Sequence, residues 1–208
     1  MRAVAALAGL AFLSACGQSA EKAATAAGNE EFPVVEAPVA NTSIGPDGAA
    51  GISTAIPLTV EAAQAAAPHF IVAASEGMVE GDQFPIVTLS LADEIVFTLM
   101  PAPGHERIGA IVTRSSQARG PANEVIGQST FGQAQAAGVL FCREAQPWEV
   151  FTFTCAANEN ANFWRAYTMP ESYQGDRMPF TAIDPDAVLT AVLTEMSWIA
   201  PREESDQR

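Results

Sequence analysis

Basic side chains are scarce in this chain of 208 residues. Ten lysines and arginines stand against 24 acidic residues, which gives a formal net charge of −14 at pH 7, and Lys22 is the single lysine. Proteins that bind nucleic acid gather lysine and arginine on one face to neutralise phosphates. The sequence therefore predicts no nucleic-acid partner, and the acidic chain gains nothing from an anionic membrane surface.

Histidine and cysteine, the residues that most often hold metals, are also rare. His69 and His105 are the two histidines, and no HExxH or HxH spacing surrounds them. Neither Cys142 nor Cys155 belongs to a CxxC pair or has a histidine nearby, as a zinc site would require. We therefore predict no metal and no cofactor.

The chain also lacks an apolar run of the about 20 residues that a membrane-spanning helix needs. The longest such stretch, residues 3–13, follows the positive charge of Arg2 and precedes the small residues Ser14 and Ala15. A basic residue, a short apolar stretch and then small residues are typical of a secretory signal peptide. We expect residues 1–15 to be a signal peptide that is removed on export.

The segment Leu13-Ser14-Ala15-Cys16 resembles the lipobox of bacterial lipoproteins. In that family the cysteine receives diacylglycerol, the chain is cut just before it and the new amino terminus is acylated. The resemblance implies that Cys16 carries lipid and anchors the protein to a membrane, because two or three acyl chains bind stably. Gly17, where an aspartate is absent, implies sorting to the outer membrane. The alternative is an ordinary signal peptide followed by a chance cysteine.

Composition divides the mature chain into three parts. Residues 16–50 are rich in alanine, proline, glycine and acids without an apolar period, and this predicts a disordered acidic tether. Residues 51–201 have the length of one domain with one core, and residues 202–208 form a polar tail. Loss of Arg2 leaves nine basic against 24 acidic residues, a formal charge of −15 that favours solubility.

Residue patterns predict an α+β domain with a mainly antiparallel sheet, one short N-terminal helix and a C-terminal amphipathic helix. The N-terminal helix covers residues 59–67, with Thr59 as its cap and Pro68 as its end. The C-terminal helix begins at Asp184-Pro185-Asp186, and five apolar residues at helical spacing should share one face: Val188, Leu189, Val192, Leu193 and Met196. Alternation and turn residues predict strands at 87–91, 95–100, 108–114, from 125, 139–143, 150–155 and 163–168.

Cys142 and Cys155 lie symmetrically about the predicted hairpin turn at Gln146-Pro147-Trp148. Export would place them in an oxidising compartment, and antiparallel pairing would bring them opposite each other. We predict a structural disulfide that closes a loop of about 14 residues and contributes about 3 kcal/mol to stability. A redox-active pair is the alternative.

Other polar and aromatic groups match no catalytic pattern, and we assign no catalytic residue. The run Gly127–Gly132 has one residue too many for the G-x-S-x-G turn of hydrolases, so Ser129 or Thr130 should cap a short helix. Glu76, Glu80 and Asp82 do not match a calcium loop, and they predict a solvated acidic turn. Residues 158–162 should be a loop, and Trp148, Trp164 and Trp198 should pack in the domain.

Residues 125–131, followed by the two cysteines in paired strands, resemble the YfeY-like lipoproteins of proteobacteria over about residues 51–169. The resemblance implies a single α+β domain that faces the periplasm, and it supplies no catalytic residues. We therefore expect a lipid-anchored envelope protein with a binding or structural role, whose partner is a protein or glycan of the envelope. The alternative is an envelope hydrolase that uses loop carboxylates as acid and base.

Overall fold

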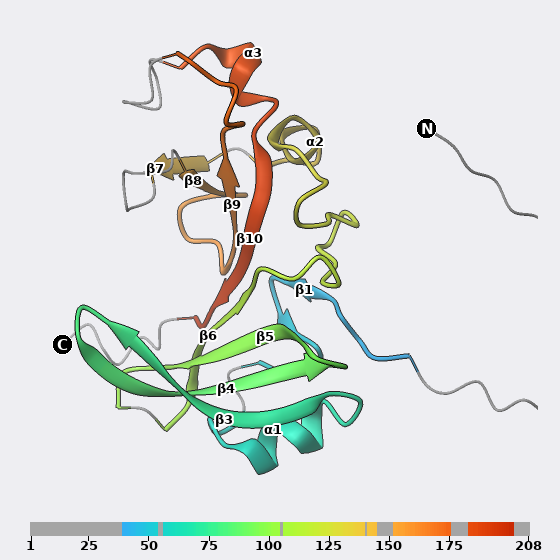
Figure 1. The fold of residues 1–208 in the computed structure, drawn as a ribbon, viewed down its shortest axis with the longest axis vertical. Coiled ribbons are helices and arrows are strands. Elements are labelled where there is room, and N and C mark those ends of the chain that lie inside the picture. Colours follow the sequence, from blue (N-terminus) through green and yellow to red (C-terminus); the bar gives the residue numbers. More distant parts are fainter. Residues whose placement is uncertain are drawn as a thin grey trace, which may run out of the picture. The chain divides into compact units, whose positions relative to one another are not determined.

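The fold is that of a computed structural model, which describes residues 39–53, 56–104, 106–139, 141–144, 152–175 and 183–201. Its main feature is an eight-stranded antiparallel sheet with the strand order β3-β4-β5-β6-β10-β9-β8-β7 (Figure 1). The predicted mainly antiparallel sheet is therefore confirmed. Within the described residues, no helix has the length and apolarity that a membrane crossing requires.

The first four strands of the sheet follow one another in the chain. They are β3 (Ile71–Val79), β4 (Asp82–Leu91), β5 (Glu94–Pro101) and β6 (Ile108–Thr113), each antiparallel to the next. Short turns join β3 to β4 and β4 to β5, as hairpins require. The predicted strands at 87–91, 95–100 and 108–114 lie here, whereas β3 was not predicted.

Three strands form the other end of the sheet, and the last strand of the chain joins the two ends. Strands β7 (Phe141–Glu144), β8 (Thr152–Ala156) and β9 (Phe163–Thr168) pair in order, and β10 (Val192–Ile199) lies between β9 and β6. The core is continuous across this junction, because side chains from both ends belong to one buried cluster. Its largest fully buried members include Phe97, Phe153, Tyr167 and Trp198.

The predicted N-terminal helix is confirmed as α1 (Val60–Ala66). The Thr59 hydroxyl accepts a hydrogen bond from the N–H of Ala62, 3.2 Å away, and thereby satisfies one of the free donors of the first turn. The helix lies beside the start of β3 (Figure 1). The Gln64 amide donates to the carbonyl of Phe70 at 3.1 Å, which ties α1 to that end of the strand.

The predicted C-terminal amphipathic helix is wrong. Helix α3 covers only Pro185–Val188, and residues 192–199 form β10 instead. A β-bulge between Leu193 and Glu195 shifts the alternation of the strand, so that Leu193, Met196 and Trp198 all face the core. Because the bulge adds one residue between two core-facing positions, Leu193 and Met196 are three residues apart, as they would be on one face of a helix.

Tertiary hydrogen bonds also keep the chain before β10 out of a helix. The carbonyls of Leu189 and Ala191 accept the N–H groups of Gly132 and Phe131 at 3.0 and 2.9 Å. These donors belong to the first turn of α2 (Phe131–Ala136), where a helix has no partners of its own for them. The free N–H groups of the first turn of α2 and the carbonyls of the segment before β10 therefore satisfy each other.

The predicted strand from Val125 is also wrong, because the chain turns there. The N–H groups of Gln128 and Ser129 both donate to the carbonyl of Val125, at 3.1 and 2.9 Å. Gly127 has a φ of +78°, in the left-handed region that glycine adopts without strain. A residue with a Cβ atom adopts this conformation less readily.

The predicted tether was extended too far into the domain. Within it, β1 (Ile44–Gly45) and β2 (Gly48–Ala49) form a small hairpin, and Ile44, Ala49 and Ala50 belong to the buried core. The Trp198 indole N–H donates to the carbonyl of Pro46 at 2.9 Å, which fixes the turn of this hairpin to β10. The folded domain therefore begins before residue 44 rather than at residue 51.

This boundary leads to a stability prediction for the hairpin. Ile44 is 2% exposed, so Ile44→Ala should lower the free energy of unfolding by about 2–4 kcal/mol through lost burial and the cavity left behind. Val39 is 91% exposed, and the matched change Val39→Ala should alter it by less than about 0.5 kcal/mol. Urea denaturation measures both values, and equal effects of the two changes would contradict this placement of the hairpin.

Candidate functional site

The disulfide predicted from the sequence is present between β7 and β8. Cys142 and Cys155 are directly opposite in the antiparallel register, with their Cα atoms 4.1 Å apart, and they are joined by an S–S bond. Cys155 is fully buried, and its neighbour Phe153 on the same face belongs to the core. The bond thus lies against apolar side chains, which favours a structural role over redox exchange.

The remaining polar candidates of the sequence do not come together as a catalytic group. His69 is exposed beyond the end of α1, and His105 lies outside the described residues. The Ser129 hydroxyl accepts a hydrogen bond from the Val125 N–H at 2.9 Å, and Thr130 is the N-cap of α2, with its N–H held by Gln133 at 2.9 Å. These hydroxyl residues support local structure, as predicted.

In the described part of the chain, the acidic and aromatic candidates do not form a catalytic or metal-binding group either. Glu76, Glu80 and Asp82 are exposed on the β3–β4 hairpin, and the described ranges contain no group of three or more residues suited to hold a metal ion. Residues 158–162 are a loop in which Asn158 accepts from the N–H of Asn160. Trp164 and Trp198 are buried, and each indole N–H donates to a carbonyl, whereas Trp148 lies outside the described residues.

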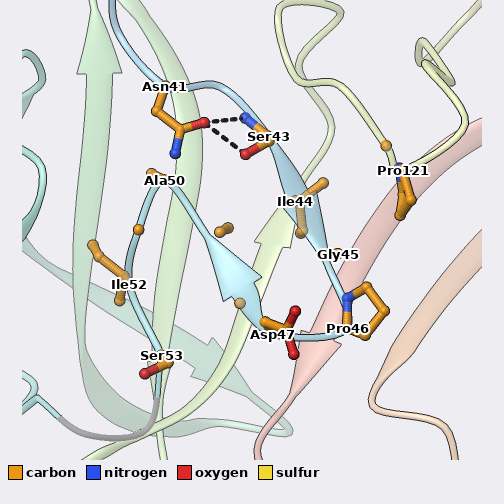
Figure 2. A pocket seen from close by; sticks show the side chains of 14 residues that line it. Asn41, Ser43, Ile44, Gly45, Pro46, Asp47, Ala50, Ile52, Ser53 and Pro121 are labelled. Carbon is orange, nitrogen blue, oxygen red and sulfur yellow. Dashed lines mark hydrogen bonds between the residues drawn. The ribbon is translucent and has the colours of Figure 1, made fainter.

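A hollow of about 500 Å³ lies over the β1–β2 hairpin and the loop that contains Gly120 and Pro121 (Figure 2). Most of its lining is backbone and small side chains. The Asn41 carboxamide oxygen, at its rim, accepts from both the N–H and the hydroxyl of Ser43, at 3.1 and 2.6 Å. Asp47 is the one carboxylate among its lining residues. The hollow therefore lacks the pair of carboxyl groups that glycoside hydrolysis needs.

Glu124, which lies against Gly120 of this lining, takes part in a buried ion pair that no sequence pattern indicated. The Arg165 Nε donates to Glu124 Oε1 at 2.6 Å, and the two residues are 7% and 4% exposed. Glu124 also accepts from the N–H of Ala122 at 2.8 Å, and the Arg165 guanidinium lies 4.4 Å above the ring of Phe163. Burial of two charges is tolerable with such bonds, so the pair fixes the 119–124 loop to β9.

Tyr167 lies two residues further along β9. Its hydroxyl is buried and has no hydrogen-bond partner among the described residues. Burial, which disfavours the phenolate, raises the pKa of Tyr167, with a smaller opposing effect from Arg165. Tyr167, Arg165 and Glu124 are all buried, and none of them lines the hollows that the described residues form at 41–53, 82–103 and 74–85.

The most unusual exposed feature is the outer edge of the sheet at β3. We call Ile71–Val79 and its exposed side chains the edge surface. Seven large apolar side chains are exposed in the part of the chain that the structure describes, and three of them belong to this strand: Ile71, Met78 and Val79. Strand β3 has nine residues, so this edge of the sheet is long as well as apolar.

Natural proteins protect a long edge strand with lysine, proline or a bulge. The edge surface has none of these devices, because its sequence IVAASEGMV contains a single charge, Glu76, and its nine pairs with β4 run without a register shift. Gly77 is covered on one face by the ring of Phe84 from β4, where a Cβ atom would lie 2.6 Å from the ring. This cross-strand contact keeps the strand regular up to the hairpin turn.

Taken together, these features define a small domain with an extended antiparallel sheet and a long, apolar edge strand at β3. Neither a protein-family model nor a curated protein sequence matches the chain. Among solved structures, the chain is similar to the uncharacterised protein YfeY from Escherichia coli. The TM-score is 0.56 at 13% sequence identity, over 76% of this chain and 99% of YfeY. The predicted resemblance to YfeY is thus supported at the level of the fold.

The disulfide provides the prediction for this region. Cys142→Ser should lower the free energy of unfolding by about 3 kcal/mol, because the bond restricts the unfolded chain, while the native circular dichroism should be nearly unchanged. Chemical denaturation with and without reductant measures the effect. Reductant should destabilise the wild type by the same amount and leave the variant unaffected. A wild type indifferent to reductant would show that the bond does not support the fold.

Proposed function

We propose that this protein is a lipid-anchored protein of the bacterial envelope, held at the outer membrane through Cys16, whose domain faces the periplasm and acts by binding another protein. The observation that carries the binding role is the edge surface. A strand edge with unpaired backbone groups and exposed apolar side chains is the template used in β-strand addition. A protein partner accounts for this feature better than a glycan, which would not complete a row of backbone hydrogen bonds.

The anchor rests on the start of the chain. The apolar stretch, the small residues and Cys16 occur in the order that lipid attachment requires. The acidic charge of the chain would give no attraction to an anionic membrane surface, so attachment would depend on the lipid at Cys16.

A binding role also agrees with the chemistry of the hollows. Three of them are lined by described residues, and each has one carboxylate: Asp47, Asp82 and Glu76. Acid–base hydrolysis by two carboxyl groups would need both of them in one cleft, about 5–10 Å apart. None of the three hollows supplies this arrangement.

The anchor is tested by labelling cells with radioactive palmitate. The wild type should incorporate label and sediment with membranes, whereas Cys16→Ala should incorporate none, because only a thiol forms the thioether. Cys142→Ser is the matched cysteine control and should be labelled like the wild type. Label in Cys16→Ala, or an unlabelled wild type, would refute the lipid anchor.

A further inference from the structure

The backbone groups of the edge surface point alternately toward β4 and away from the sheet. The turn at Glu80 and Gly81 has positive φ at both residues, +53° and +95°, as in the two-residue hairpins whose flanking residues exchange hydrogen bonds. Val79 and every second residue before it therefore face β4. The Ala73 carbonyl confirms this parity, since it accepts the Thr88 hydroxyl of β4 at 3.3 Å.

The other set of backbone groups forms the open edge. Its first member, the Phe70 carbonyl, is occupied by the Gln64 amide of α1. Among the described residues, no further backbone bond reaches Val72, Ala74, Glu76 or Met78 from outside the sheet. The open edge thus runs from Val72 to Met78, and its midpoint is Ser75.

We propose that the edge surface binds a second copy of this chain, with the two β3 strands antiparallel about a two-fold axis at Ser75. In this register Val72 pairs with Met78 of the other copy and Ala74 with Glu76, so all four residues with open backbone groups are hydrogen-bonded. An interface about a two-fold axis must be self-complementary. The segment meets this condition because its open groups are placed symmetrically.

The side chains fit the same register. Directly opposite residues lie on one face of a sheet, so Ile71 of one copy would contact Val79 of the other, and Val72 would contact Met78. Ile71, Met78 and Val79 are 63%, 65% and 56% exposed in the single chain. Every large apolar side chain of the edge surface therefore gains an apolar neighbour, which a register shifted by two residues would not achieve.

The charges of the strand point to the same axis. Glu76 would face Ala74 of the other copy, whereas a shift of the axis to residue 76 would place the two Glu76 carboxylates directly opposite each other, a destabilising arrangement. At the ends of the pairing, the acidic turn at Glu80 would reach the exposed His69 of the other copy. The net charge of −14 on each chain opposes the approach, and salt should weaken this repulsion.

This inference specifies the partner of the proposed binding role, although its test does not depend on the lipid. We would oxidise the full-length Ser75→Cys protein with oxidised glutathione and analyse it on a non-reducing denaturing gel. Ser75 and its symmetry mate would form a close pair, with Cα atoms about 4.5 Å apart, a separation that a disulfide spans. Most of the variant should become a covalent dimer.

Ala73→Cys is the matched control, because it lies on the same exposed face of the strand two residues away. Its symmetry mate would be about 14 Å distant along the strand, beyond the about 7 Å limit for a disulfide. It should therefore cross-link at least about tenfold less than Ser75→Cys. Oxidation of the wild type shows how much cross-linking a free thiol at Cys16 produces by itself. Equal cross-linking of the two variants, or none in Ser75→Cys, would overturn the proposal.

Ala74→Pro tests the hydrogen bonds without a cross-link. Its N–H points away from β4, so proline at this edge position should leave the fold in place, yet it removes one bond from each half of the dimer. Sedimentation should give Ala74→Pro a dimer dissociation constant at least about tenfold higher than that of the wild type. The dissociation constant of the wild-type dimer should fall as the salt concentration rises. A wild type that is monomeric at all concentrations, or Ser75→Cys linked to a different envelope protein, would refute the second copy. Palmitate labelling of Cys16 would be unaffected by either result.

Discussion

Strand β10 is the constraint on which the rest of the domain depends, because in the described part of the chain it is the strand that hydrogen-bonds the two ends of the sheet to each other. It is hydrogen-bonded to β6 on one side and to β9 on the other, and its residues Leu193, Met196 and Trp198 fill the core where the two ends meet. The Trp198 indole also holds the β1–β2 hairpin through Pro46. A strand near the end of the chain thus completes structures that begin near residue 44, so the domain depends on contacts of long sequence separation.

This arrangement also determines which strands have an unpaired edge. Once β10 has joined the two ends into one sheet, six strands are internal and two edges remain. The β3 edge has nine residues, and it has none of the lysine, proline or bulge devices with which proteins avoid unwanted strand pairing. Because a long open edge is a hazard for a monomer, its presence favours a protein that uses the edge for binding.

Local signals in the sequence predicted the parts of the fold that local chemistry decides. Thr59 caps α1, the short turn at Asp93 joins two alternating strands, and the two cysteines pair across a hairpin. Strand β10 was missed because its bulge imitates helical spacing. The β1–β2 hairpin was missed because its buried residues are mostly alanines in a stretch of disorder-like composition. Tertiary contacts, such as the burial of Ile44 and the hydrogen bond from Trp198 to Pro46, distinguish it from a tether.

The candidate site was missed for a different physical reason. An edge strand is exposed on more than one side, and β3 therefore shows no apolar alternation from which a strand could be predicted. The available signal was an absence, namely that residues 71–79 combine apolar and small residues without lysine or proline. The ion pair between Glu124 and Arg165 joins residues 41 apart in the chain, and one sequence contains no signal for such a partner.

The central claim is that the edge of β3 is open in the single chain, and residue-resolved amide exchange by NMR tests it most directly. In dilute protein, the amides of Val72, Ala74, Glu76 and Met78 should exchange rapidly, because they face away from the sheet. The amides of Ala73, Ser75 and Gly77, which are bonded to β4, should be protected together with those of β10. Slow exchange of both sets at every dilution would contradict the account, because another part of the same chain would then cover the edge.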